Sequence, residues 1–204
     1  MKSISSPPVK VFVDPETLQT DSFILASKVF EDGFEPDFMV AIWRGGAQIG
    51  CCVHEFFKYL DMKVDHIAIR TSRYTGIDET SAKVEVHNLG YLVERVKSTS
   101  KVLLVDDIFD TGSSIAAIIE TLKEKLGSNM PTDMRVATVY YKPTRNESDR
   151  VPDYFVKETS EWIVFPHELE ALTNEEIVLS KGVEVANLVR KAQESRLGKK
   201  ETKI

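Results

Sequence analysis

Hydrophobic residues along this chain form two kinds of pattern, short continuous runs and longer stretches with helical spacing. Short apolar runs bounded by turn residues are typical of strands buried on both faces, whereas intervals of three and four residues indicate amphipathic helices. The two patterns alternate along the chain. They predict strands at residues 9–13, 38–43, 64–70, 101–105, 135–141 and 162–165, and helices at residues 22–31, 47–60, 90–97, 115–126 and 174–193.

The alternation of strands with helices predicts an α/β fold with a mainly parallel, twisted sheet flanked by helices. A length of 204 residues fits a single domain with a sizeable core. Residues 1–8 are polar and contain proline, so we expect a loose N-terminal extension there. Residues 174–204 are expected to form a C-terminal helix and tail. In the helix at residues 22–31, the predicted inward-facing side chains are Phe23, Ala26, Val29 and Phe30.

The segment at residues 72–88 is polar, contains glycine and has little apolar periodicity. Connections of this length without regular structure are uncommon in compact domains and are often lids over a functional site. We therefore predict a functional loop at this point of the chain.

The charge balance narrows the class of partner. The formal net charge of −6 argues against general binding of nucleic acid. No apolar run approaches the length needed to span a membrane, and the first residues lack the apolar core of a signal peptide. We therefore expect a cytoplasmic protein that has neither nucleic acid nor membrane as a partner.

The stretch Val102–Ile115 carries the most informative chemistry, since a strand runs into the adjacent acids Asp106 and Asp107. A third acid and a small hydroxyl-rich turn follow, and then a helix begins. The helix N-terminus favours an anion, and the turn adds hydroxyl donors and a glycine that lets the backbone come close. The two adjacent carboxylates suit hydroxyl groups or a divalent cation. A phosphorylated sugar satisfies both halves of this segment, whose turn residues are Asp110, Thr111, Gly112, Ser113 and Ser114.

Two further segments have the residue types of binding sites. A strand runs into Arg44, Gly45 and Gly46 before the next helix, and an arginine at a helix N-terminus favours an anion. Later in the chain, Lys142 ends a strand and Trp162 begins another. A tryptophan offers a flat face for a heteroaromatic base, and a lysine can donate to an exocyclic oxygen.

The stretch Val102–Ile115 resembles, position by position, the phosphoribosyl-pyrophosphate signature of type I phosphoribosyltransferases, and the other two segments are similar to the 6-oxopurine branch of that family. The resemblance implies the type I fold, with a small hood at roughly residues 142–170 over a single domain of residues 1–204. It implies transfer of the phosphoribosyl group from phosphoribosyl pyrophosphate to hypoxanthine, guanine or xanthine in purine salvage. Pyrophosphate and a nucleoside monophosphate would be the products, and relatives commonly form homo-oligomers, either dimers or tetramers.

Residue roles follow from the same resemblance. Asp106 and Asp107 would orient the ribose hydroxyls, directly or through Mg²⁺, and residues 110–114 would hold the 5′-phosphate. Asp110 would also lie near the purine N7, where it would act as general base or stabilise the protonated base. The remaining implied roles are pyrophosphate binding by Arg44 and Gly45 beside a cis peptide bond at Trp43–Arg44, base binding by Lys142, Trp162 and Ile163, and a flexible closing loop with Ser72 and Tyr74.

The resemblance leaves some alternatives open. His167 stands beside the expected base pocket where relatives usually have tryptophan, so the preferred purine is not specified. A non-catalytic regulator that senses phosphoribosyl pyrophosphate is one rival reading, although it would need a basic face. A phosphoribosyltransferase for a non-purine acceptor is the other.

Overall fold

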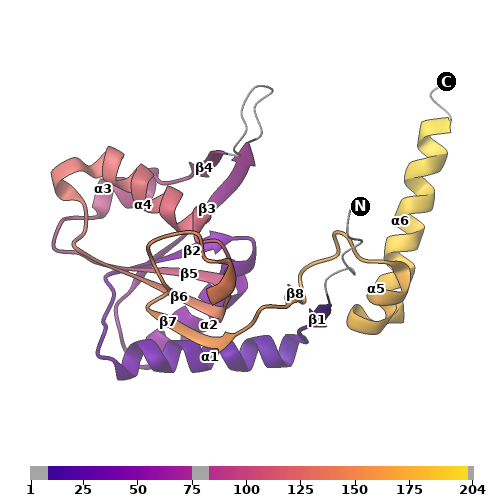
Figure 1. The fold of residues 1–204 in the computed structure, drawn as a ribbon, viewed down its shortest axis with the longest axis horizontal. Helices are drawn as coiled ribbons and strands as arrows, with labels where there is room; N and C mark the ends of the chain where they lie inside the picture. Colours follow the sequence, from indigo (N-terminus) through magenta and orange to yellow (C-terminus); the bar gives the residue numbers. More distant parts are fainter. Residues whose placement is uncertain (1–8, 75–82, 202–204) are drawn as a thin grey trace, which may run out of the picture. The chain divides into compact units, whose positions relative to one another are not determined.

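The computed structural model describes residues 9–74 and 83–201 (Figure 1). The chain divides into two compact units, of which the larger comprises residues 18–160 and the smaller comprises residues 1–17 with residues 161–204. Each unit is described by itself below. No helix among the described residues is both long enough and apolar enough to cross a membrane.

A six-stranded sheet forms the centre of the larger unit, in the order β4-β3-β2-β5-β6-β7. All neighbouring strands run parallel except β3 and β4, which are antiparallel. The mainly parallel α/β sheet predicted from the alternating pattern is therefore confirmed. The strands are β2 (Phe38–Trp43), β3 (Asp65–Tyr74), β4 (Lys83–His87), β5 (Lys101–Phe109), β6 (Asp133–Tyr141) and β7 (Tyr154–Glu158).

Helices cover both faces of this sheet, with α3 and α4 on one side and α1 and α2 on the other (Figure 1). The side chains of the central strands are buried on both faces, because alternate residues point to opposite helix layers. The cluster on the α3 and α4 side includes Val40, Leu104, Ile118 and Leu122. The helical elements are α1 (Pro15–Glu31), α2 (Gly45–Tyr59), α3 (Gly90–Arg95), the short helix η1 (Gly127–Asn129), α4 (Ser113–Leu126) and η2 (Pro143–Arg145).

In the smaller unit, β1 (Lys10–Phe12) pairs in parallel with β8 (Trp162–Val164). The predicted helix at residues 174–193 is two helices, α5 (Asn174–Lys181) and α6 (Val183–Glu201). Gly182, with φ of 90°, separates them, because that backbone conformation interrupts a helix and costs glycine little. Thr173 and Glu176 form a capping box at the start of α5.

Helix α1 differs from the prediction in its start and in its buried face. It begins at Pro15, seven residues before the predicted start, where proline is tolerated in a first helical turn. Ala26 and Val29 are buried as expected, but the prediction was wrong for Phe23 and Phe30, which are 38% and 44% exposed. The buried face of α1 includes two polar residues, so the apolar side chains alone did not identify it. Its members are Leu18, Asp21, Ser22, Leu25, Ala26 and Val29.

The segment at residues 72–88 is not the plain loop that its polarity predicted. Strand β3 continues to Tyr74, and β4 occupies Lys83–His87 in antiparallel register with it, while residues 75–82 lie outside the described part. An edge strand can be polar on the face that no helix covers, which explains the weak apolar pattern. Strand β7, at the other edge of the sheet, was missed for the same reason.

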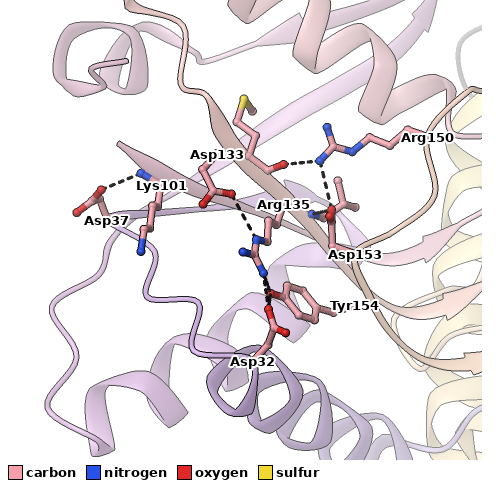
Figure 2. Close-up of polar contacts among 10 residues, drawn as sticks. Asp32, Asp37, Lys101, Asp133, Arg135, Arg150, Asp153 and Tyr154 are labelled. Carbon is pink, nitrogen blue, oxygen red and sulfur yellow. Dashed lines mark hydrogen bonds and ion pairs between the residues drawn. The ribbon is translucent and has the colours of Figure 1, made fainter. Parts of the chain in front are cut away.

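A network of polar contacts lies at the edge of the sheet where β5, β6 and β7 begin (Figure 2). The Tyr154 hydroxyl donates to Asp32 Oδ2 over 2.8 Å, and Arg135 contacts both groups. Asp32 follows the last residue of α1, so the network ties this helix to two strands. Hydrogen bonds from Tyr154 and Arg135 lower the pKa of Asp32 below its ordinary value, and burial together with the bond to Asp32 raises the pKa of Tyr154 to about 12.

We predict that Asp32→Asn lowers the melting temperature at pH 7 and that the deficit shrinks in acid. A carboxyl group whose pKa is lowered by folding stabilises the folded state above the unfolded pKa, and this contribution disappears as pH falls through the folded value. The ordinary pKa of 3.8 therefore marks the upper end of the window. Thermal unfolding of both proteins between pH 7 and pH 3 tests this, and a deficit that is equal at every pH would contradict it.

Candidate functional site

The acidic pair Asp106 and Asp107 lies near the carboxyl end of β5, at the sheet edge opposite the network of Figure 2. The prediction ended this strand at residue 105, but pairing with β6 continues to Phe109. The two acids are therefore part of a strand and not of a turn. They line a cavity of about 180 Å³ whose walls are the consecutive residues 106–115.

The environment of Asp106 disfavours a negative charge on Asp106 beside the one on Asp107. Burial and the neighbouring carboxylate of Asp107 raise the pKa of Asp106 well above its usual range, although main-chain hydrogen bonds from Asp107 and Gly46 act in the opposite direction. The Asp107 amide donates to Asp106 Oδ1 over 3.0 Å. A cation or several hydroxyl donors would relieve this crowding of negative charge.

The turn after β5 leads directly into a helix N-terminus, as the sequence predicts. Gly112 has φ of 80°, a left-handed conformation that glycine adopts most readily, and α4 begins at Ser113. The Thr111 hydroxyl donates to Ser113 Oγ over 2.9 Å. All of the predicted phosphate-binding residues line the cavity, at the end of α4 whose free amides favour an anion.

The loop Arg44–Gly46 lies against the acidic pair. The peptide bond between Trp43 and Arg44 is cis, which confirms the expectation from the resemblance. A β-carbon on Gly45 would come 1.7 Å from Asp107 Oδ2, and one on Gly46 would come 2.3 Å from the Val105 carbonyl oxygen. Helix α2 begins at Gly45, so its N-terminus and the exposed Arg44 adjoin the acids of β5.

Lys142 follows β6, and its amide donates to the Phe109 carbonyl over 2.9 Å. Its side chain is only 5% exposed, and its Nζ lies 3.7 Å from Asp110 Oδ2. The base-binding lysine and the general base of the resemblance are therefore neighbours at this edge. Because Lys142 is buried, it is not the surface lysine that a plain strand end would carry.

Arg145 is a site residue that the sequence reasoning missed. Its Nε lies 2.7 Å from Asp110 Oδ1. The signal was a second cation three residues after Lys142, just past a strand whose neighbour ends in acids. Spacing alone could not assign it, because the short helix η2 turns the arginine back toward Asp110.

The remaining predicted residues are placed as follows. Trp162 is 48% exposed and Ile163 is buried, both in β8 of the smaller unit. Ser72 lies in β3, where its hydroxyl and His87 Nε2 share a hydrogen bond of 2.9 Å. Tyr74 is the last residue of β3. His167 stacks on Phe165, with ring centroids 5.6 Å apart.

The donor set of the acidic pair fits magnesium better than a metal held by protein alone. The described residues hold no group of three or more histidine, cysteine, aspartate or glutamate side chains that could bind a metal ion. Magnesium commonly takes one or two carboxylates and completes its shell with water and substrate oxygens. Asp106 and Asp107 are adjacent carboxylates of this kind, and both line the cavity of residues 106–115.

Comparison with known protein families identifies the chain. The sequence model of the phosphoribosyl transferase domain matches residues 20–174. This chain belongs to that family. A comparison with curated proteins gives no significant match.

Solved structures agree with this membership. A purine phosphoribosyltransferase from Pyrococcus horikoshii is 27% identical over 80% of this chain and 97% of its own, with a TM-score of 0.63. A xanthine-guanine-hypoxanthine phosphoribosyltransferase from Helicobacter pylori is 22% identical over 78% and 92%, with a TM-score of 0.57. A hypothetical protein from Neisseria gonorrhoeae with bound ppGpp is 17% identical over 87% and 98%, with a TM-score of 0.65. The latter two share the fold of this phosphoribosyltransferase chain.

We predict that Gly46→Ala lowers the free energy of unfolding by about 1–3 kcal/mol. The added methyl group would clash with main-chain atoms of β5, which can move only if the strand moves with them. Gly90→Ala is the matched control, because a β-carbon there has nothing within 4 Å. Urea unfolding of the two variants measures the difference. Equal stability would show that the loop has room to shift away from β5.

Proposed function

We propose that this protein transfers the phosphoribosyl group from phosphoribosyl pyrophosphate to a 6-oxopurine, either hypoxanthine, guanine or xanthine. The observation that carries the proposal is the pair of Asp110 and the buried Lys142, 3.7 Å apart and beside the phosphate-sized turn. A proton acceptor and a cationic donor at this separation suit the N7 and O6 edge of such a base. The Pyrococcus relative, a purine phosphoribosyltransferase, supports a purine as the acceptor.

The sugar-phosphate half of the proposed site is the cavity of residues 106–115. Residues 110–114 would bind the 5′-phosphate through their amides and hydroxyls, and the carboxylates of Asp106 and Asp107 would accept from the ribose 2′- and 3′-hydroxyls. Arg44 and Gly45 would bind pyrophosphate at the start of α2. Asp106 and Asp107 would hold Mg²⁺, which when bound would supply positive charge to neutralise the leaving pyrophosphate.

The proposed reaction forms the bond between the base nitrogen N9 and the ribose anomeric carbon, while the bond from that carbon to pyrophosphate breaks. Asp110 would take the proton that the base loses at N7. Lys142 would donate to the exocyclic oxygen, Trp162 would stack on the base, and the main chain of Ile163 would read its edge.

Closure and assembly complete the proposal. The closing loop with Ser72 and Tyr74 would cover the reacting centre and exclude water, which otherwise hydrolyses the activated sugar. We propose that the chain works as one phosphoribosyltransferase domain, with a hood at about residues 142–170, in a cytoplasmic dimer or tetramer.

We predict release of pyrophosphate from phosphoribosyl pyrophosphate and Mg²⁺ only when a 6-oxopurine is present. The assay takes hypoxanthine, guanine, xanthine, adenine, uracil and orotate separately, and the ranking of the first three gives the preference beside His167. Turnover with uracil or orotate alone would show that the acceptor is a pyrimidine and not a 6-oxopurine. Binding of phosphoribosyl pyrophosphate without turnover of any base would favour a non-catalytic regulator.

We predict that Asp110→Asn lowers kcat by at least about a hundredfold and changes the affinity for phosphoribosyl pyrophosphate little, because an amide cannot accept the proton. Steady-state kinetics and calorimetry measure the two quantities. Asp61→Asn is the matched control, since Asp61 is exposed and follows the far end of α2, about 22 Å from Gly45. Equal losses of turnover and affinity would remove the general-base role.

A further inference from the structure

Main-chain hydrogen bonds hold the segment Lys142–Glu147 on both sides of Asp110. The Lys142 amide donates to the carbonyl of Phe109, the residue before Asp110, over 2.9 Å. The Glu147 amide donates to the carbonyl of Thr111, the residue after it, over 3.1 Å. Arg145 lies between these two bonds, so its backbone is fixed relative to the carboxylate.

The turn that follows Arg145 is also built against the phosphate-sized loop. Asn146 Oδ1 accepts from the Ser148 amide over 2.9 Å, and the Asn146 side chain donates to the Arg150 carbonyl over 2.8 Å. A β-carbon on Gly112 would come 2.3 Å from Ser148 Oγ, which shows how closely the turn packs on the loop. The position of Arg145 is therefore part of the fold and does not depend on its exposed side chain.

The contact between Arg145 and Asp110 is an ion pair without hydrogen-bond alignment. Arg145 Nε lies 2.7 Å from Asp110 Oδ1, yet this buried oxygen accepts no hydrogen bond from any residue that the structure describes. The oxygen thus keeps its capacity to accept from a ligand while a positive charge lies beside it.

The two cations that face Asp110 differ in exposure. Lys142 is 5% exposed and contacts Oδ2, whereas Arg145 is 51% exposed and contacts Oδ1. If Lys142 turns to the oxygen of a bound base, as in the proposed function, Asp110 loses one of its two compensating charges. Arg145 is the cation that remains.

We propose that Arg145 is a positioning residue that keeps a positive charge beside the Asp110 carboxylate while Lys142 turns to the bound base. The inference rests on the proposed function and adds to it a residue that acts through Asp110 and not on the substrate. A cation this close to a carboxylate stabilises its negative charge, and Arg145 is the one that the proposed movement of Lys142 leaves in place.

The experiment compares Arg145→Ala and Arg145→Lys with the wild type in the pH profile of kcat/KM for the preferred base. We expect Arg145→Ala to lose kcat/KM several-fold at the acid end of the profile, with screening by water limiting the loss, and to recover activity near pH 8.5. Arg145→Lys should restore most of the wild-type profile, because it keeps the charge. Arg95→Ala, which removes another half-exposed arginine, from α3, is the matched control and should leave the profile unchanged.

A second readout separates failure of this inference from failure of the proposed function. Carbon NMR of the Asp110 carboxyl group, assigned with Asp110→Asn, follows its titration in protein without substrate. Its midpoint should move up in Arg145→Ala even if no base is turned over. An unmoved midpoint with equal loss of activity at every pH would overturn the proposal. Higher activity of Arg145→Ala at every pH would also overturn it, because Arg145 would then inhibit the reaction.

Discussion

The arrangement of the candidate site depends on the close contact between the Arg44–Gly46 loop and the end of β5. No side-chain atom fits on either glycine, because Asp107 and the Val105 carbonyl occupy the space. This contact sets the start of α2 against the acidic pair, and it requires the neighbouring parallel strands β2 and β5 to end at the same edge. The start of α2 and the acidic pair of β5 are therefore held together by contacts that only glycine permits.

Two kinds of carboxylate result at one sheet edge. Asp106 and Asp107 crowd each other, and burial raises the pKa of Asp106, so this pair suits a cation or hydroxyl donors. Asp110, three residues later, instead faces Lys142 and Arg145. The two environments therefore differ in charge, since one is crowded with carboxylates and the other faces two cations.

Local patterns predicted the parts of this structure that local chemistry decides. The apolar run before Asp106, the glycine at the start of α4 and the alternation of strands with helices all carry their own signal in the sequence. Long-range packing decided the rest. Phe23 was expected inside because it is aromatic, yet the buried face of α1 takes Asp21, whose carboxylate pairs with Lys157 of β7 over 2.6 Å. The signal for Arg145, a cation three residues after Lys142, could not identify its partner, because the contact with Asp110 exists only in the folded chain.

Strand β6 connects two regions of the molecule that have different chemistry. Its amino end carries Arg135 in the network with Asp32 and Tyr154 (Figure 2). Its carboxyl end leads into Lys142. Seven residues of extended strand separate these positions, about 23 Å. Substitutions that far apart, with no shared partner, usually have additive effects. Changes that raise thermal tolerance around Arg135 can therefore be combined with changes around Lys142 without optimising the two sets together.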